Sequence, residues 1–440
     1  MGNEKITLIG AGLAGPLMAT YLAQHGYSVA IYESRPDMRK VDLSAGRSIN
    51  LALSIRGINA LKEVGVFGRI EPITIPMKGR MIHDLDGNIY LQPYGQKEDE
   101  VIYSVSRAQL NMDLITHAQE TGKVDIHFEH TLDSADLQTN ELEFGNKKVF
   151  FDKVIGCDGS SSALRQAIIE KSNANYEKKP LGHGYKELTI PPSASGDFQI
   201  ETHALHIWPR GEYMLIALPN MDRSFTCTLF FPMTGHTSFA TVQKEDEIIR
   251  LFQNQFPDAY DLMPTVVKDF QTNPTSHLAT VYCDPWHYED KAILLGDAAH
   301  AVVPFFGQGM NASFQDCSVL NKLIVKYGGD WKDVFNGFTK SHVMNGHAIA
   351  DMAIENYIEM RDLVNDPIYK KRRELELLLE AKFSERFIPR YSMVSFHQIP
   401  YAEVYRRGEI QFKLMNQYLS NELTETQLHE HIKQQLTPIR

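Results

Sequence analysis

The stretch KITLIGAGLAGPLMATYLAQHGYSVAIYE, residues Lys5–Glu33, decides the fold of this chain. A short apolar strand runs straight into the glycines Gly10, Gly12 and Gly15, and an apolar helical pattern and a second strand follow. The first glycine permits a tight turn, the second lets a pyrophosphate approach the backbone, and the third lets helix and strand pack closely. The stretch predicts a Rossmann-like βαβ unit that binds a dinucleotide.

The second strand ends at Glu33, about 20 residues after the glycines, where a carboxylate can accept hydrogen bonds from ribose hydroxyls. The same carboxylate would repel a 2′-phosphate, so the fingerprint suits NAD or FAD and not NADPH. Leu13, Ala14 and Arg35 flank these positions. We expect all three to contact the same cofactor.

A second informative stretch is AILLGDAAHAVVPFFGQGMN, residues Ala292–Asn311. It indicates a buried strand, a turn that places Asp297 at the strand end, an apolar loop, and a helix that begins after Gly307 and Gly309. Free backbone N–H groups at a helix start favour negative charge. We interpret the stretch as the cradle for the reactive ring of a flavin, although alone it also fits an ordinary strand–loop–helix connection.

The rest of the chain falls into regions that differ in their residue pattern. A strand–turn–helix junction at Lys153–Arg165 carries Asp158, and short strands rich in β-branched and aromatic residues follow up to about Thr280. Beyond Asn311 the pattern is almost wholly helical, and we interpret its basic run Lys370–Arg373 as a solvated face. This pattern predicts an α/β fold with a Rossmann-like FAD-binding domain (residues 1–75, 100–180 and 281–325), an inserted antiparallel β-sheet substrate domain (76–99 and 181–280) and a helical C-terminal region (326–440) that closes the active site.

Composition limits the classes of function. The chain has 440 residues and a net charge of −11, which argues against a nucleic-acid partner. Its four cysteines are scattered without a CxxC pair, as in a reducing compartment. No signal-peptide pattern precedes the first strand, and no run approaches the ~18 apolar residues of a membrane span. We therefore expect a soluble cytoplasmic protein without a membrane anchor, and a homodimer stays open.

The three junctions, at Gly10–Gly15, Asp158-Gly159 and Gly296-Asp297, resemble in their order those of the class A flavoprotein aromatic hydroxylases, which share the para-hydroxybenzoate hydroxylase fold. Further motifs resemble the kynurenine 3-monooxygenase family within that class, and the resemblance extends from the first strand to near Ile410. These motifs are GRSINLALS (Gly46–Ser54), GRMIH (Gly79–His83), LQPYG (Leu91–Gly95), VPFFGQGMN (Val303–Asn311), ENYIEM (Glu355–Met360) and RYSMV (Arg390–Val394).

The resemblance implies bound FAD, and NADPH and O2 as co-substrates. The implied cofactor-binding residues are Gly10, Gly12, Leu13, Ala14, Gly15, Glu33, Arg35, Ala52, Arg107, Leu132, Asp158, Asp297, Gly309, Met310 and Asn311. Asp297 would face the ribityl or pyrophosphate portion, and Met310 and Asn311 the flavin ring. Cys157 stands where the family usually has alanine, a change between small residues. Eukaryotic relatives carry a membrane-anchoring C-terminal segment, which this polar tail does not resemble.

The resemblance also implies hydroxylation of L-kynurenine through a flavin C4a-hydroperoxide, a step of tryptophan degradation. The implied substrate-binding residues are Arg80, Tyr94, Asn356 and Tyr391, to which we add Pro304, Phe305, Glu359 and Met360. The planar fork of Arg80 can grip a carboxylate with two hydrogen bonds, and Asn356, Glu359 and Met360 share one helix face. Pro304 and Phe305 would form a dry wall.

No residue is predicted to act as a catalytic acid or base, and no metal site is predicted. His203 and His206 lie three apart in an expected strand and would face opposite ways. Two alternatives stay open: a class A hydroxylase for another aromatic acid, and a flavin-binding interaction protein without turnover.

Overall fold

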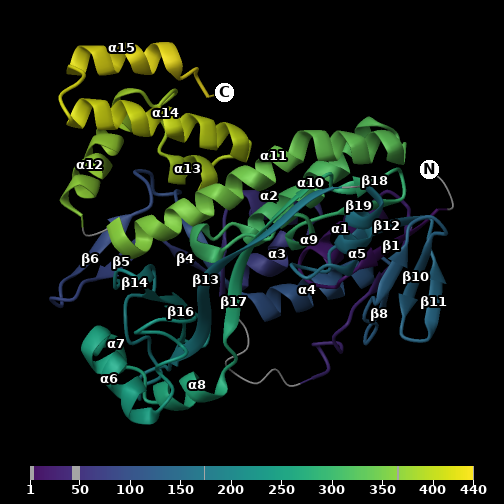
Figure 1. The fold of residues 1–440 in the computed structure, drawn as a ribbon, viewed down its shortest axis with the longest axis horizontal. Coiled ribbons are helices and arrows are strands. Elements are labelled where there is room, and N and C mark those ends of the chain that lie inside the picture. Colours follow the sequence, from purple (N-terminus) through teal and green to yellow (C-terminus); the bar gives the residue numbers. More distant parts are fainter. Residues whose placement is uncertain (1–3, 42–49, 173, 364–365, 440) are drawn as a thin grey trace.

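The computed structural model describes residues 4–41, 50–172, 174–363 and 366–439, so Gly46–Ile49 of the GRSINLALS motif lie outside the described residues. A mostly parallel sheet lies at one end of the molecule and a large, mostly antiparallel sheet at the other (Figure 1). The long helix α11 (Trp331–Ile358) runs across both parts, and it contacts strands of each sheet. The predicted α/β class with a helical C-terminal region is confirmed.

The first sheet forms the dinucleotide-binding part. Its strand order is β18 (His287–Tyr288), β19 (Ala292–Leu294), β12 (Lys153–Gly156), β1 (Lys5–Ile9), β2 (Ser28–Tyr32) and β8 (Val124–His127). All neighbours are parallel except β18 and β19. The strands are nearly continuous apolar runs because both faces are buried. Helix α1 (Ala14–Gln24) links β1 to β2, which confirms the predicted βαβ unit, and it packs against α4 (Arg107–Glu120) and α10 (Gly309–Lys326).

The second sheet has the strand order β17 (Ser276–Asp284), β13 (Asn175–Ile190), β16 (Phe225–Pro232), β15 (Met214–Pro219), β14 (Leu205–Pro209), β5 (Gly79–His83) and β6 (Ile89–Pro93). Only β14 and β5 pair in parallel. The hairpin β5–β6 thereby joins strands that come more than 100 residues later in the chain, because Leu205 of β14 pairs with Arg80 of β5. This pairing brings Arg80 to the sheet that faces the first domain.

Two smaller sheets and several short elements complete the first 175 residues. One sheet contains β3 (Asn50–Leu53), β7 (Ile102–Ser106) and β4 (Thr74–Met77), and the other β11 (Lys147–Phe150), β10 (Glu141–Phe144) and β9 (Ser134–Asp136). The helices are α2 (Ile55–Glu63), α3 (Phe67–Ile70), the 3-10 turn η1 (Glu71–Ile73) and α5 (Ala163–Ser172).

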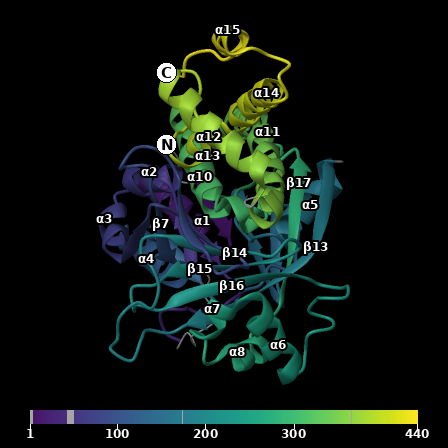
Figure 2. The ribbon, with the colours of Figure 1, turned by 90° about the vertical axis from the view of Figure 1, so that its left-hand side faces the viewer.

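Three helices lie within the region for which the sequence predicts only strands: α6 (Glu245–Gln255), α7 (Pro257–Tyr260) and α8 (Val266–Thr272). They cover the outer face of the large sheet (Figure 2). Ile248, Leu251 and Phe252 of α6 belong to the same buried cluster as Trp208 of β14. These apolar residues are spaced as in a helix, so α6 could have been predicted from the sequence. His203 precedes β14, whereas His206 lies inside the same outer layer and contacts His83, with 2.8 Å between ring nitrogens.

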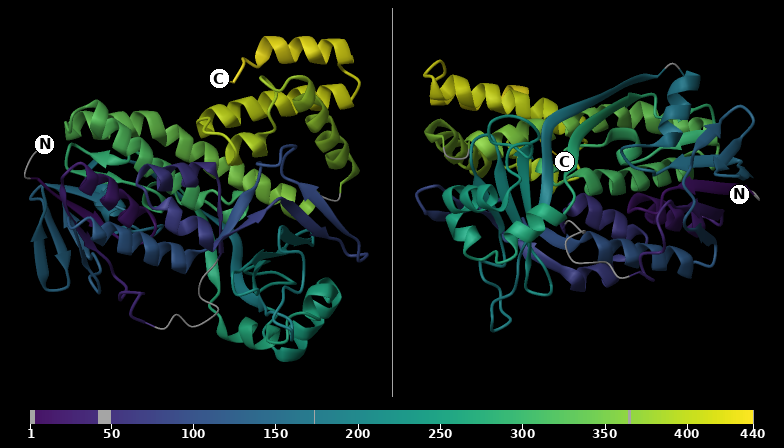
Figure 3. Two further views of the ribbon diagram at one scale, coloured as in Figure 1. Left: turned by 180° about the vertical axis from the view of Figure 1, so that it is seen from behind. Right: turned by 60° about the horizontal axis from the view of Figure 1, so that its bottom comes forward.

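The C-terminal helices form a separate layer at the end of the molecule that holds the second sheet (Figure 3). Before this layer come α9 (Asp297–His300) and the turn η2 (Pro304–Phe306). The layer follows α11 and a π turn, η3 (Glu359–Leu363), and consists of α12 (Pro367–Lys382), α13 (Arg390–Ser395), α14 (Tyr401–Leu419) and α15 (Glu425–Gln435). Arg56 of α2 fixes it to the first domain, because its guanidinium donates to the Val394 carbonyl at 2.9 Å and lies 4.0 Å from the Tyr401 ring centre. Among the described helices, none has the length and apolar character to cross a bilayer.

Candidate active site

The glycine turn after β1 has the geometry that a dinucleotide needs. Gly10 has a φ of +100°, and a Cβ there would overlap the carbonyl of Cys157. A Cβ at Gly15 would overlap the carbonyl of Gly10, whereas one at Gly12 would meet no heavy atom of the described chain within 4 Å. Gly10 and Gly15 therefore serve close packing, and Gly12 leaves space beside the start of α1, where an anion is favoured.

Glu33 is held as a charged acceptor beside this turn. Its side chain accepts hydrogen bonds from the backbone N–H groups of Ala11 (2.7 Å) and Arg35 (2.9 Å), and it pairs with the Arg35 guanidinium at 2.8 Å. Burial opposes ionisation, but the Arg35 contacts and the two backbone donors outweigh it and lower the pKa of Glu33. A buried, ionised carboxylate at this place suits ribose hydroxyls.

Asp297 begins α9 and is exposed to an internal cavity although protein surrounds it. Burial raises the pKa of its carboxyl group, and the positive charge of Arg107 opposes that effect. The loop is held from behind by Asp316 of α10, which accepts from the Gly296 N–H at 2.8 Å and contacts His300 Nε2 at 2.6 Å. Gly296 has a φ of +59°, a conformation that favours glycine.

The residues at the start of α10 that were predicted to lie at the flavin ring differ in position. Gly309 and Met310 line the cavity. Asn311 is fully buried, and its amide donates to the carbonyls of Ala52 and Gly307, both at 2.8 Å, and accepts from the Ser54 N–H at 2.9 Å. Asn311 therefore positions Ala52 and the loop before α10 through its side chain, and it is not among the residues that line the cavity.

These elements enclose one long cavity of about 760 Å³. The predicted cofactor residues that line it are Gly10, Gly12, Leu13, Ala14, Glu33, Arg35, Ala52, Arg107, Leu132, Asp158, Asp297, Gly309 and Met310, whereas Gly15 and Asn311 lie behind this lining. The volume is in the range of cofactor sites. The open space at Gly12, the charged acceptor Glu33 and the helix starts fit the pyrophosphate and ribose of FAD.

At its far end the long cavity becomes apolar. Pro304, Phe305 and Phe306 of η2 line it, and the Phe305 ring stacks on Tyr357 with 3.9 Å between ring centres. Met360 of η3 lies there as well. The sequence interpretation missed four apolar residues that complete this wall from the large sheet: Leu205, Met214, Ile216 and Phe230. Apolar residues in a strand are typical of any sheet core, so nothing in the local sequence distinguishes these four as cavity residues.

Arg80 lies between this apolar end and a second space. Its side chain is 7% exposed, and its polar contacts within the described residues are long, to Glu359 Oε1 (3.4 Å) and Asn356 Oδ1 (3.5 Å). The guanidinium carbon lies 4.9 Å from the Tyr391 ring centre. Since none of these contacts is short, the donors of Arg80 can turn to a carboxylate.

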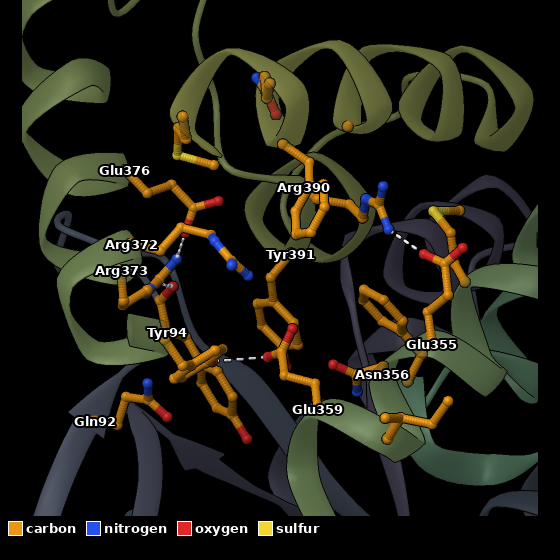
Figure 4. Close-up of a pocket in the computed structure, with 18 of the residues that line it drawn as sticks. Gln92, Tyr94, Glu355, Asn356, Glu359, Arg372, Arg373, Glu376, Arg390 and Tyr391 are labelled. Atoms are coloured by element: carbon orange, nitrogen blue, oxygen red, sulfur yellow. Dashed lines mark hydrogen bonds and ion pairs between the residues drawn. The ribbon is translucent and has the colours of Figure 1, made fainter. Parts of the chain in front are cut away.

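The second space, here called the outer cavity, has a volume of about 420 Å³ and lies between β6, α11, α12, α13 and α14 (Figure 4). Arg80, Phe306 and Tyr391 line both cavities. The predicted substrate residues Tyr94, Asn356 and Glu359 line only the outer cavity, whereas Pro304, Phe305 and Met360 line only the long cavity. The structure therefore divides the predicted substrate set between two adjoining spaces.

Tyr94 is prepared as a hydrogen-bond donor in the outer cavity. Its ring stacks on Tyr391 with 4.9 Å between ring centres, and its buried hydroxyl makes no hydrogen bond within the described residues. Burial raises the pKa of Tyr94 far above its ordinary value, so the hydroxyl keeps its proton. An unpaired buried hydroxyl is costly unless a ligand completes it.

The interpretation of Lys370–Arg373 as a solvated face is wrong for its second half. Arg372 and Arg373 line the outer cavity (Figure 4), where Arg373 pairs with Glu376 and donates to the Tyr94 carbonyl at 3.1 Å. A charge run gives no sign of the helix that will cover it. Packing of α12 against α14 leaves these two side chains only half-exposed.

Comparison with known proteins identifies the family. Residues 4–333 match the family model of the FAD binding domain. Kynurenine 3-monooxygenase of Myxococcus xanthus is 46% identical over 414 residues, which cover 93% of this chain and 89% of the relative. Kynurenine 3-monooxygenase of Dictyostelium discoideum is 42% identical over 435 residues, or 96% and 93% of the two chains.

Solved structures share the fold at low sequence identity. The 2-methyl-3-hydroxypyridine-5-carboxylic acid oxygenase superposes with a TM-score of 0.68 at 18% identity, over 83% of this chain and 95% of that one. The tetracycline destructase Tet(51) superposes with a TM-score of 0.62 at 19% identity, over 90% and 99%. Fold, cavity and sequence agree: the chain belongs to the kynurenine 3-monooxygenase family of FAD-binding monooxygenases.

Proposed function

We infer that this protein is an FAD-dependent monooxygenase that consumes NADPH and O2 and hydroxylates L-kynurenine at carbon 3. One observation carries the inference beyond family membership. A single long cavity joins the glycine turn and Asp297 at one end to an apolar wall and the Arg80 guanidinium at the other. A cofactor and an aromatic acid can therefore meet inside the protein.

The cofactor end would hold FAD through the backbone at Gly12, the carboxylate of Glu33 and the loop at Asp297. Bound FAD, once reduced by NADPH, supplies the activated oxygen for the hydroxylation. Because the ionised Glu33 repels a 2′-phosphate, we propose that NADPH does not use this fingerprint and visits the flavin transiently.

The apolar end would exclude water from the reacting atoms. Phe305 is fixed from two sides, by its stack on Tyr357 and by a contact with Phe230 at 4.7 Å between ring centres. Asn356 Nδ2 donates to the Phe305 carbonyl at 2.7 Å, which ties this wall to α11. A rigid dry wall protects the activated oxygen from wasteful release as hydrogen peroxide.

Arg80 would orient the substrate. A kynurenine carboxylate can take two parallel hydrogen bonds from the guanidinium, which a lysine could not offer in that geometry. The amine on the aromatic ring activates its own ring, so we propose no side chain as catalytic acid or base. The role of the protein is then to bind, to orient and to keep the site dry.

The test is NADPH oxidation by the FAD-loaded protein with L-kynurenine, with the product identified by mass and by its hydroxyl position. Other aromatic acids form the control panel. We expect oxidation that L-kynurenine stimulates and a 3-hydroxylated product. Stimulation by a different aromatic acid alone would assign another substrate, and FAD absorbance without NADPH oxidation under any ligand would reject the enzymatic function.

We also propose a cytoplasmic location. All four cysteines are free, as in a reducing compartment. Fractionation of cells that produce the protein from its own gene tests this, and recovery with the membrane fraction would contradict it.

A further inference from the structure

A row of polar contacts, here called the histidine chain, crosses the outer layer of the large sheet. Asp258 Oδ2 lies 2.7 Å from His83 Nδ1, and His83 Nε2 lies 2.8 Å from His206 Nδ1. At its other end, His206 Nε2 lies 2.7 Å from the Glu201 backbone carbonyl. His83 and His206 are buried, with 3% and 1% of their surface exposed. Each of the four ring nitrogens therefore has one partner within the chain of contacts.

The two ends of the histidine chain fix the number of its protons. A carboxylate and a backbone carbonyl only accept hydrogen bonds, so His83 Nδ1 and His206 Nε2 must both donate. The contact between His83 Nε2 and His206 Nδ1 needs one further proton, which makes three. Two neutral imidazoles carry only two ring protons. The complete chain therefore contains one imidazolium.

The surroundings assign the extra proton to His83. Burial lowers the pKa of His206 to about 4 and outweighs the contact with the Glu201 carbonyl, so His206 is neutral. Burial opposes the ionisation of Asp258, but its contacts with His83 and Trp208 outweigh this effect and lower its pKa. Asp258 is therefore a carboxylate, and the imidazolium lies directly beside it.

The other charged groups around the two rings agree with one positive charge. The Arg210 guanidinium donates to the His83 carbonyl at 3.0 Å, and Asp84 and the carboxylate of the chain offset its charge. The Glu201 carboxylate adds negative charge at the far end. The Trp208 ring stacks on His83 with 4.1 Å between ring centres, and the face of an indole attracts a cation.

The histidine chain supports the strand that carries Arg80. Strand β5 pairs with β14 over three residues, from Arg80–Leu205 to Ile82–Ile207. Parallel pairs are slightly less stable than antiparallel ones. His83 is the next residue of β5, and its side chain continues this short ladder to β14 and α7. Because residues three apart in a strand face opposite ways, Arg80 points to the cavities while His83 holds β5 from the outer side.

We propose that His83, His206 and Asp258 share one extra proton and thereby position Arg80, so that the grip on the substrate carboxylate weakens when this proton is lost at rising pH. Without the proton, one contact of the histidine chain brings two acceptors together, and a buried acceptor without a donor is destabilising. The three residues are positioning residues, since they act through Arg80. This inference rests on the proposed function, because it takes L-kynurenine as the ligand of Arg80.

The first measurement counts the protons directly in the FAD-loaded protein. Nuclear magnetic resonance of isotope-labelled histidine distinguishes protonated from unprotonated ring nitrogens, and the signals are assigned through His83→Gln and His206→Gln. The test variant is Asp258→Asn. Its amide can donate to His83 Nδ1 and accept from Trp208 Nε1, which now donates to Asp258 at 3.0 Å, so the chain is complete with two neutral rings.

The matched control is Asp261→Asn. Asp261 directly follows α7 and is exposed, so its replacement removes the same charge close to Asp258 without a change in the histidine chain. The second measurement is the Kd for L-kynurenine, obtained by calorimetry without NADPH. It covers about pH 5 to 9, because histidine ordinarily titrates near pH 6.5.

We expect three protons on the His83–His206 pair of the wild type below about pH 6.5, and two in Asp258→Asn. The Kd should rise up to about tenfold with pH in the wild type and in Asp261→Asn, as for one lost hydrogen bond. Asp258→Asn should lack this rise.

Two protons on the wild-type pair would overturn the shared proton, and this measurement needs no variant. An equal rise of Kd with pH in the wild type and in Asp258→Asn would overturn the positioning of Arg80. Failure of the proposed function looks different, because L-kynurenine would then not bind the wild type at any pH. The role at Arg80 would fall with it, whereas the proton count would still decide the state of the histidine chain.

Discussion

Replacing Arg80 with methionine removes the guanidinium and keeps most of the apolar stem. The side chain is 7% exposed, and its two polar contacts, to Glu359 and Asn356, are 3.4 and 3.5 Å long. A substrate carboxylate would therefore displace only weak partners. Two hydrogen bonds between charged groups then contribute about 3 to 5 kcal/mol, which corresponds to roughly two to nearly four orders of magnitude in kcat/KM.

The assay is NADPH oxidation over a range of L-kynurenine concentrations, with FAD content read from the ratio of flavin to protein absorbance. We expect a large rise in KM and unchanged FAD content, because the glycine turn, Glu33 and Asp297 do not contact Arg80. Arg250→Met is the control, since Arg250 lies on the outer helix α6 with a 67% exposed side chain. An unchanged KM in the Arg80 variant would refute the carboxylate grip.

Three further predictions concern the cofactor end and the wall. Asp297→Ala should lose FAD during purification, and a fully yellow variant would count against that role. Phe305→Ala should let water reach the flavin, so NADPH consumed per hydroxylated product should rise severalfold; a ratio unchanged from the wild type would show that Phe305 is not needed for dryness. Burial lowers the pKa of His300, but the contact with Asp316 has the larger effect, so the net result is a raised pKa. The ion pair therefore stabilises the fold below about pH 6.5, and this contribution is lost as pH rises through the pKa of His300 in the folded protein. The melting temperature of the FAD-loaded protein should therefore fall on the alkaline side and fall less in Asp316→Asn; equal slopes would contradict the linkage.

The parts of the fold that could be predicted are those whose information is local. The turn at Gly10–Gly15 requires both close packing and open space within a few residues. The order of strand, glycines, helix and strand in the sequence is enough to predict such a turn. Helix α4 was predicted with the same bounds, Arg107–Glu120, because its apolar positions repeat with helical spacing. In contrast, β13 extends back to Asn175 through an exposed, charged half that pairs with β17. No alternation marks that half.

The candidate site rests on the family resemblance more than on the physics of its residues. Arg80 alone reads as a strand arginine, and its role depends on β5 pairing with β14, more than 100 residues later. The division of Tyr94 and Phe305 between two cavities depends on where α13 places Tyr391. Arg372 shows the same limit, because α12 has a charged sequence on a surface that α14 covers. Burial by a distant helix leaves no mark in the buried segment.

The stretch Ala292–Asn311 shows how a local motif depends on residues beyond it. The free N–H groups of the loop and the start of α10 are local properties, but their placement is not. Asp316, one and a half turns beyond Asn311 on α10, holds Gly296 at the start of the loop, and His342 of α11 contacts the same carboxylate at 3.3 Å. Asn311 ties the start of the helix to β3. The helix thus braces the loop that precedes it. Asp316 does not line the long cavity, so a change at Asp316 should weaken FAD binding only through this loop.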